Sequence, residues 1–158
     1  MSAFALLAIL SGCDQPFAPK PAQAVPYPVS LLLPQKIVIH PFTSTKTFDD
    51  GTKGVEAHIE LRDAYDDPTK AFGDFRFQLY MFKPQSPDPK GRLVASWTED
   101  LQDPKKNAVH WSNVSRTYIF KLECADALPP GKQYVMVAWF SSPYTERLFN
   151  QRVFTAGQ

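Results

Sequence analysis

Several features that define other protein classes are scarce in this chain of 158 residues. Two cysteines are too few for a disulfide framework, and no apolar run approaches the roughly 20 residues of a membrane-spanning helix. The 17 basic and 16 acidic residues leave a net charge of +1, which gives no electrostatic basis for nucleic-acid binding. Glycine-rich phosphate loops, Gly-x-Ser-x-Gly and His-Glu-x-x-His are also missing. We therefore expect neither an enzyme nor a bound cofactor.

The N-terminus carries a localisation signal. An apolar run from Ala3 to Leu10 is followed at once by Ser11, Gly12 and Cys13. Such a run is too short to span a bilayer but fits the apolar part of a secretory signal. The sequence Leu10-Ser11-Gly12-Cys13 resembles the lipobox of bacterial lipoproteins. The alternative is a short buried apolar segment in which Cys13 is incidental.

The lipobox resemblance has three implications. Residues 1–12 are removed as a signal peptide, the Cys13 sulfur carries a diacylglycerol, and the mature chain is anchored to a membrane of the cell envelope, facing the periplasm or the exterior. Two or three acyl chains on one cysteine give stable anchoring. Which membrane holds the protein is left open.

A proline-rich segment follows the cysteine. Residues 13–35 form a predicted tether, because their proline density blocks helices and sheet interiors and favours extended polyproline II. The apolar stretch from Leu31 to Leu33 is unusual for a free linker. We expect it to dock on its own domain, with docking on a partner as the alternative.

The remaining residues, 36–158, have the pattern of short β-strands. Apolar and polar residues alternate, turn residues separate the alternating stretches, and no stretch has a helical period of useful length. The predicted strands lie at about 37–39, 55–61, 75–81, 93–97, 117–122, 134–140 and 147–154. Seven strands in one domain predict an all-β fold, an antiparallel β-sandwich.

Two short motifs resemble known sandwich families. The stretch Leu128-Pro129-Pro130-Gly131-Lys132-Gln133-Tyr134 resembles the Leu-x-Pro-Gly-x-x-Tyr corner of fibronectin type III and related immunoglobulin-like domains. That resemblance implies that the Tyr134 hydroxyl ties the corner to upstream backbone. Residues 61–75 resemble the second-to-third strand loop of bacterial immunoglobulin-like and prealbumin-like domains. Together they imply an immunoglobulin-like sandwich and say nothing of function.

Two groups of polar residues are candidate metal ligands. Glu56, His58 and Glu60 share one face of a predicted strand, where a zinc site would need a further ligand from a neighbouring strand. We expect a solvated face instead. Four carboxylates crowd a predicted loop region: Asp63, Asp66, Asp67 and Asp74. We expect them to bond their own backbone in turns, and calcium binding is left open.

Cys124 follows an apolar strand and, four residues after Phe120, points to the same face as that residue. We therefore expect a buried thiol. With Cys13 lipidated, it has no partner for a disulfide in the chain.

The strand at 134–140 is apolar on both faces. Val135, Val137 and Trp139 lie opposite the residues that alternate toward the core, so a linker, a loop or a partner must cover them. Trp111 and Tyr144 fall in loop-like segments, where they would stack on a sugar, anchor a protein contact, or cap the ends of the sandwich.

Three classes of function remain. The favoured hypothesis is a non-catalytic lipoprotein whose sandwich binds a protein partner in a cell-envelope assembly, through the apolar strand face and the two loop aromatics. A carbohydrate- or cell-wall-binding module that uses the loop aromatics is the alternative. An enzyme or metal carrier is the third class, and Glu56, His58 and Glu60 would be its site.

Overall fold

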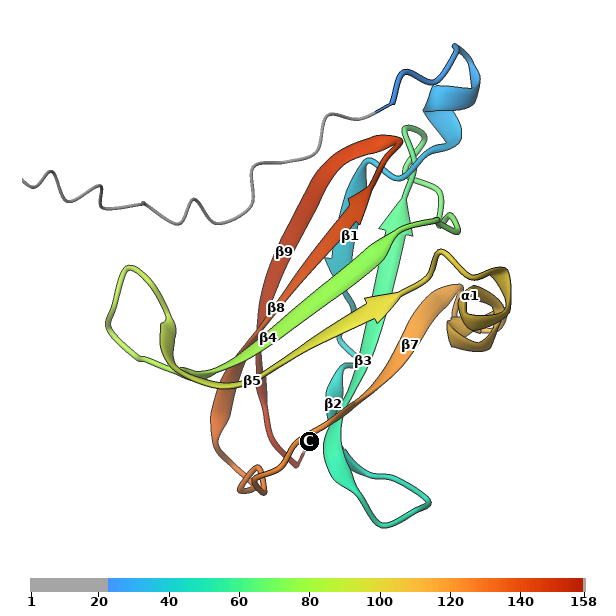
Figure 1. Cartoon of the computed structure of the whole chain (residues 1–158). Coiled ribbons are helices and arrows are strands. Elements are labelled where there is room, and N and C mark those ends of the chain that lie inside the picture. The colour runs from blue at the N-terminus through green and yellow to red at the C-terminus, as the bar shows by residue number, and fades with distance from the viewer. Residues whose placement is uncertain (1–22, 158) are drawn as a thin grey trace, which may run out of the picture.

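The computed structural model describes residues 23–157, which form two antiparallel β-sheets packed face to face (Figure 1). The first sheet has the order β1-β3-β7-β6 with β2 also paired to β3, and the second has the order β5-β4-β8-β9. The first sheet contains β1 (Lys36–Ile39), β2 (Ser44–Thr47), β3 (Lys53–Arg62), β6 (Trp111–Ser112) and β7 (Thr117–Glu123). The second contains β4 (Asp74–Phe82), β5 (Lys90–Asp100), β8 (Gln133–Ser142) and β9 (Thr145–Thr155). The predicted all-β sandwich is confirmed.

Three short elements were absent from the sequence prediction. The strand β2 has the sequence Ser-Thr-Lys-Thr, which offers no apolar alternation, and β6 has two residues. The helix α1 (Pro104–His110) lies where a loop was predicted, and Trp111 lies in β6 rather than in a loop. The helix α1 begins with a typical N-terminal cap. Asp103 accepts a hydrogen bond from the backbone N–H of Lys105 at 2.9 Å, and Pro104 occupies the first turn.

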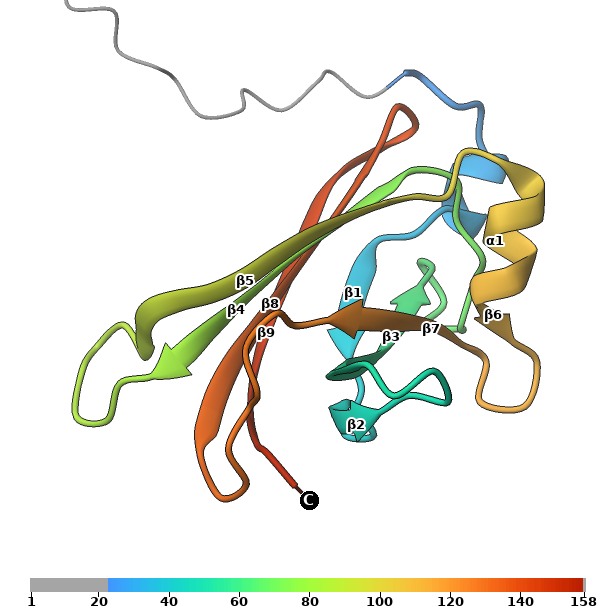
Figure 2. The ribbon, with the colours of Figure 1, turned by 60° about the horizontal axis from the view of Figure 1, so that its bottom comes forward.

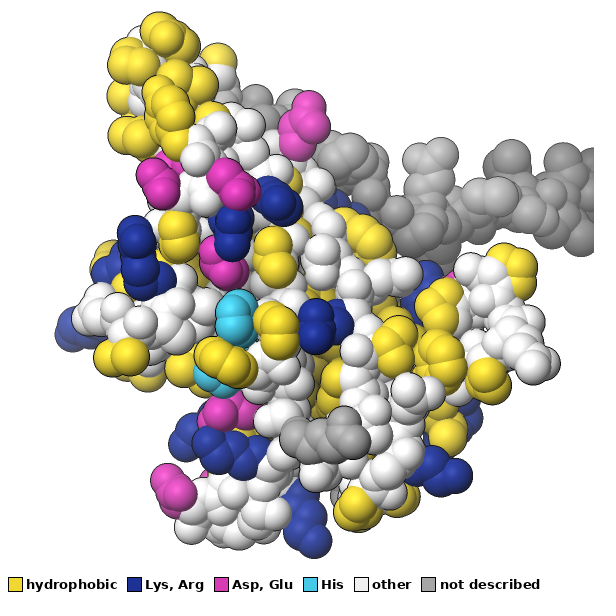
Figure 3. All heavy atoms as spheres, turned by 180° about the vertical axis from the view of Figure 1, so that it is seen from behind, with side chains coloured by type: hydrophobic (Ala, Val, Ile, Leu, Met, Phe, Trp, Pro, Cys, Tyr) yellow, Lys and Arg dark blue, Asp and Glu magenta, His cyan; other side chains and the backbone are white. Residues whose placement is uncertain are grey.

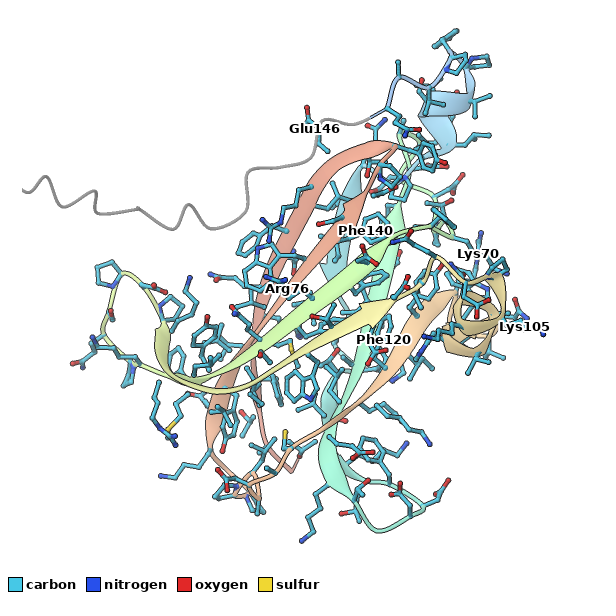
Figure 4. The ribbon with its side chains drawn as sticks, viewed as in Figure 1. Lys70, Arg76, Lys105, Phe120, Phe140 and Glu146 are labelled. Atoms are coloured by element: carbon cyan, nitrogen blue, oxygen red, sulfur yellow. The ribbon has the colours of Figure 1, made fainter. Side chains whose placement is uncertain are left out.

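Aromatic side chains from both sheets fill the core. The ring of Phe75 on β4 lies 4.9 Å from Phe140 on β8 and 5.1 Å from Phe120 on β7. Phe77 lies 5.0 Å from the same Phe120 ring. All of these side chains are fully buried, and Figure 4 shows Phe120 and Phe140 between the sheets. The predicted inward parity of β4, β7 and β8 is therefore confirmed.

A buried tyrosine on β7 ties the core to the segment that precedes β4. The hydroxyl of Tyr118 accepts a hydrogen bond from the backbone N–H of Ala71 at 2.9 Å and donates to Asn107 Oδ1 at 2.9 Å. Burial raises the pKa of Tyr118, against the opposing effect of the bonds to Ala71 and Asn107. Tyr134, which the corner motif pointed to, is buried beside Phe154, and Gly131 makes the predicted turn with φ of +78°.

The described part of the predicted tether lies on one end of the sandwich. Its centre is a 3₁₀-helix, η1 (Val29–Leu32), rather than extended polyproline II. The backbone N–H of Gln35 donates to Arg62 O at 2.7 Å, and that of Ala64 donates to Leu31 O at 3.1 Å. The stretch from Leu31 to Leu33 thus docks on its own domain, as expected. Figure 1 and Figure 2 show η1 at this end of the molecule, where the chain enters the sandwich.

Within residues 23–157, no helix has the length and apolar character that crossing a bilayer requires.

Replacing Tyr118 with Phe should lower the free energy of unfolding by about 1–3 kcal/mol, because the buried N–H of Ala71 loses its acceptor. The matched control is Tyr80→Phe, whose hydroxyl donates to Gln78 Oε1 at 2.7 Å on a half-buried surface. There solvent can take the place of the hydroxyl, so the expected loss is under about 1 kcal/mol. Urea unfolding of both variants measures the difference, and equal losses would contradict the role given to Tyr118.

Candidate functional site

The five residues predicted to contact a partner lie on two separate surfaces. Val135, Val137 and Trp139 lie on β8, on the face of the second sheet that points away from the core. Trp111 and Tyr144 lie at the end of the sandwich where the described chain begins. The sequence-based hypothesis assigned all five residues to partner binding, but the fold places them on two surfaces.

Two of the strand residues have no exposed surface. Val135 and Val137 are fully buried although they point away from the core. In the register of the sheet, Val135 is flanked by Tyr80 and Val153, and Val137 is flanked by Gln78 and Gln151. Side chains of the adjacent strands stand on both sides of each valine, so the covering comes from neighbouring strands. The segment from Leu31 to Leu33, one of the covers considered, lies at the end of the sandwich instead.

The same face carries exposed apolar side chains that sequence analysis did not select. We define the outer apolar face by five residues that surround the two buried valines: Tyr80, Leu93, Trp139, Phe149 and Val153. The exposed fractions of Phe149, Leu93 and Val153 are 51%, 45% and 39%. This is the face toward the viewer in Figure 4. The alternation in residues 147–154 indicates that Phe149 and Val153 face outward, because they have the parity opposite to the buried Phe154.

Two arginines lie beside Trp139, at one end of the outer apolar face. The guanidinium of Arg147 lies 5.8 Å from the ring centroid of Trp139, and the Phe149 ring lies 5.6 Å from that indole. Arg76 is the register partner of Trp139 on β4, and Figure 4 labels it on this face. Arginine over an indole face is a cation–π arrangement. The aromatic pair therefore has positively charged surroundings.

Trp111 is largely occupied by contacts within its own domain. Its ring meets that of Tyr118 edge-on at 5.1 Å, and the ammonium of Lys70 lies 5.3 Å from its centroid. Its indole N–H donates to Asn113 Oδ1 at 3.0 Å. These contacts make Trp111 a cap over the end of the core.

Tyr144 lies in the turn between β8 and β9 and is 39% exposed. Its ring is 6.2 Å from that of Phe72, at an interplanar angle of 48°. It separates two shallow hollows of about 350 and 320 Å³ that share Leu33 and Pro34 as walls. Lys70 and Asn107 line the second hollow, and Glu146 lines the first. Trp111 and Tyr144 are thus at the same end, joined through the segment that carries Lys70 and Phe72.

Two of the three candidate zinc ligands contact each other, and the third pairs with an arginine. Glu56 accepts from Lys46 at 2.7 Å, His58 Nε2 lies 3.3 Å from Glu56 Oε1, and Glu60 pairs with Arg62 at 2.7 Å. Burial tends to raise the pKa of Glu56, but hydrogen bonds from Lys46 and His58 outweigh it, so its pKa lies below the usual value. Glu60 is buried and His58 half-buried, so this strand face is less solvated than expected. Among residues 23–157, no cluster of three or more His, Cys, Asp or Glu side chains could hold a metal ion.

The acidic loop shows the expected turn chemistry. Asp63 Oδ1 accepts from the backbone N–H groups of Tyr65 and Asp67 at 2.9 and 3.1 Å. Asp66 has φ of 64° and pairs with Arg62 at 2.6 Å. Asp74 lies in β4 instead, where it accepts from Gln102 at 3.1 Å. The four carboxylates therefore serve different parts of the fold.

Cys124 directly follows β7 and packs against the core as a half-buried free thiol. Burial raises its pKa to about 11, and the nearby carboxylate of Asp126 adds to the shift. Because the thiolate is the reactive form, this environment suppresses alkylation and disulfide exchange at neutral pH.

We expect Cys124 to react slowly with iodoacetamide until the pH approaches about 11. A thiol whose pKa is raised by folding stabilises the fold fully below its unfolded pKa of about 8.5, and this contribution is lost as the pH rises toward the folded value. The Cys13→Ala variant leaves a single thiol, whose alkylation is followed by mass spectrometry with and without urea. Equal rates in the folded and unfolded chain at pH 8 would contradict the expected protection.

Comparison with protein-family models, with curated proteins and with solved structures found no match for this chain.

Proposed function

We propose that this chain is a lipid-anchored bacterial envelope lipoprotein whose β-sandwich binds a protein partner without catalysing a reaction. The Cys13 lipobox supports the anchor, and that cysteine lies outside the described residues. The single observation that carries the binding role is the outer apolar face, where exposed apolar side chains surround the fully buried Val135 and Val137.

The outer apolar face is unusual for the outside of an antiparallel sheet. Such sheets commonly pack one face on the core and expose a polar face to water. Here the row Leu93, Tyr80, Val135 and Val153 crosses all four strands in register and is apolar throughout apart from one hydroxyl. A row of Ser96, Gln78 and Gln151 around the buried Val137 separates that apolar row from Trp139 and Phe149. Exposed apolar surface that polar residues border marks interaction sites.

The chemistry of the face favours a protein partner. Trp139 and Phe149 pack together with Arg147 over the indole, and Trp, Tyr and Arg are the residue types that carry most of the binding energy in protein interfaces. The complementary surface on the partner is an apolar patch. Burying Phe149 and Leu93 against such a patch would remove their exposed area from water.

The carbohydrate-binding alternative has less geometric support. Sugar stacking needs an open aromatic face, whereas Lys70 lies over Trp111 and the Phe72 and Tyr144 rings are tilted by 48° to each other. The two hollows beside Tyr144 are shallow and have mixed walls.

The anchor has a direct test. Replacing Cys13 with Ala in the expressing bacterium should move the protein from the membrane fraction to the soluble fraction or leave its signal uncut, because acyl chains supply the anchoring free energy. Intact-mass measurement of the parent protein should show an N-terminal cysteine with added diacylglycerol. A parent protein that keeps residues 1–12 and carries no lipid would contradict the proposed anchor.

The binding face has a separate test. We expect Phe149→Asp to abolish crosslinking to the partner in native membranes, because it places a charge in the apolar interface. The matched control is Val114→Asp, since Val114 is 99% exposed and lies on the turn between β6 and β7. Val114→Asp should change the free energy of unfolding by less than about 1 kcal/mol because the side chain is exposed, whereas Phe149→Asp should cost about 1–2 kcal/mol because it loses the contact with the Trp139 ring. Urea unfolding checks that both variants stay folded. A partner retained at equal yield by both variants would contradict binding through this face.

A further inference from the structure

We propose that a projecting apolar knob at the tether end of the domain docks into the surface of the bilayer that holds Cys13, an inference that rests on the proposed lipid anchor. The knob is defined by its exposed apolar residues: Pro26, Tyr27, Pro28, Val29 and Leu32. Tyr27 is 79% exposed, Leu32 58% and Val29 53%. In Figure 3 the knob is the projecting group of yellow side chains at the upper left.

The composition of the knob fits an apolar interface. No Asp, Glu, Lys or Arg occurs from residue 23 to residue 35, although most of these residues are exposed. Several knob carbonyls are already satisfied within the knob, since Ser30 N donates to Pro26 O at 3.1 Å and Leu31 N donates to Pro28 O at 3.0 Å. Backbone groups that enter a lipid interface need such internal partners. A tyrosine beside aliphatic side chains suits the boundary between headgroups and acyl chains.

The knob is held in a fixed position on the sandwich. Gln35 N and Ala64 N bond it to the loop after β3, and Thr69 Oγ1 donates to Leu32 O at 3.3 Å. Gln23 N donates to Pro143 O in the β8–β9 turn, which closes the base of the knob on its other side. Docking would therefore require little further ordering of this segment.

Three more aromatic side chains are exposed at the same end. Tyr65 follows Ala64, which bonds to Leu31, and its exposed fraction is 64%. Phe72 and Tyr144 are 42% and 39% exposed and lie beside the hollow walled by Leu33. These aromatics flank the knob and would form the rim of the docked surface.

The distance to the anchor places this end at the membrane. Nine residues separate Cys13 from Gln23, so even a fully extended segment spans at most about 36 Å. A compact domain of this length has a radius of gyration near 14 Å, which corresponds to a diameter of about 35 Å. If the knob pointed away from the bilayer, the segment would have to run fully extended along the whole domain. Any shorter path brings the knob toward the lipid.

Charge does not supply the attraction. Next to the knob, Asp66 is bonded to both Arg62 and Lys36, and the hollows beside it carry one charge of each sign, Lys70 and Glu146. Docking driven by apolar side chains should occur on zwitterionic phosphatidylcholine and resist salt, whereas attraction to anionic headgroups would be screened.

The test attaches the full chain to a vesicle through Cys13 and reports the depth of the knob. The raised pKa of Cys124 lets a maleimide phospholipid couple selectively to the Cys13 thiol, so the outcome is independent of whether the cell lipidates Cys13. Val29→Trp places an indole on the knob, and Val114→Trp is the matched control on the β6–β7 turn. Emission of the parent protein is subtracted from both.

With brominated phosphatidylcholine in the vesicles, we expect the indole at position 29 to shift to shorter wavelength and lose about half of its emission, because interfacial side chains lie about 5–10 Å into the headgroup boundary. The indole at position 114 should be unaffected, and high salt should change neither result. Adding Tyr27→Glu and Leu32→Glu to Val29→Trp should remove the quenching. An unquenched indole at position 29 would overturn the proposal, as would equal quenching at both positions. A blue shift without quenching would assign the knob to a second copy or another protein instead.

Discussion

The fold depends on the packing of Phe75 between the two sheets. Its ring lies within 6 Å of four other aromatic rings, Phe77 and Phe140 from its own sheet and Tyr118 and Phe120 from the opposite one. Aromatic pairs at such distances add about 0.5–1.5 kcal/mol each beyond the area they bury. Because this cluster fills the space between the sheets, the interior is structural, and chemistry with other molecules is left to the outer surfaces.

Two of those surfaces are apolar for different reasons. On the outside of the second sheet, β8 is central and is flanked by β4 and β9, so its outward valines are covered by neighbours while exposed apolar side chains remain around them. At the tether end, a short uncharged segment is bonded onto the loops of the sandwich and projects beyond them. A membrane-anchored protein that binds a partner needs both a surface toward the lipid and one toward the partner. The two proposals therefore use different parts of the molecule.

Much of the strand pattern was accessible from the sequence because period-2 alternation reports burial on one face directly. This rule placed the inward residues of β3, β7 and β8 correctly, and those of β4 except Met81, which is exposed where the register between β4 and β5 shifts. The helix α1 was missed because seven residues are too few for a clear helical period, although the Asp103-Pro104 start was readable. The strand β2 is held by its pairing with β3, a long-range contact that its own four residues do not encode.

The candidate site was less predictable than the fold. From parity alone, Val135 and Val137 were assigned to an outward face that a linker, a loop or a partner must cover, and that face is outward as expected. Whether an outward residue is accessible depends on side chains contributed by adjacent strands, which are distant in sequence. Phe149 and Val153 were not predicted as part of this face for the same reason. Their strand, β9, lies beside β8 in the sheet, and the alternation within residues 147–154 does not show that pairing.

By itself, the sequence determined the all-β class and the turn role of Asp63, because alternation and local hydrogen bonding act over a few residues. Tertiary structure alone decided that Tyr118 ties the core to Ala71, that Trp111 caps the sandwich, and that exposed apolar side chains gather on two separate surfaces. These outcomes depend on which strands become neighbours, and strand order is set by the packing of the whole chain.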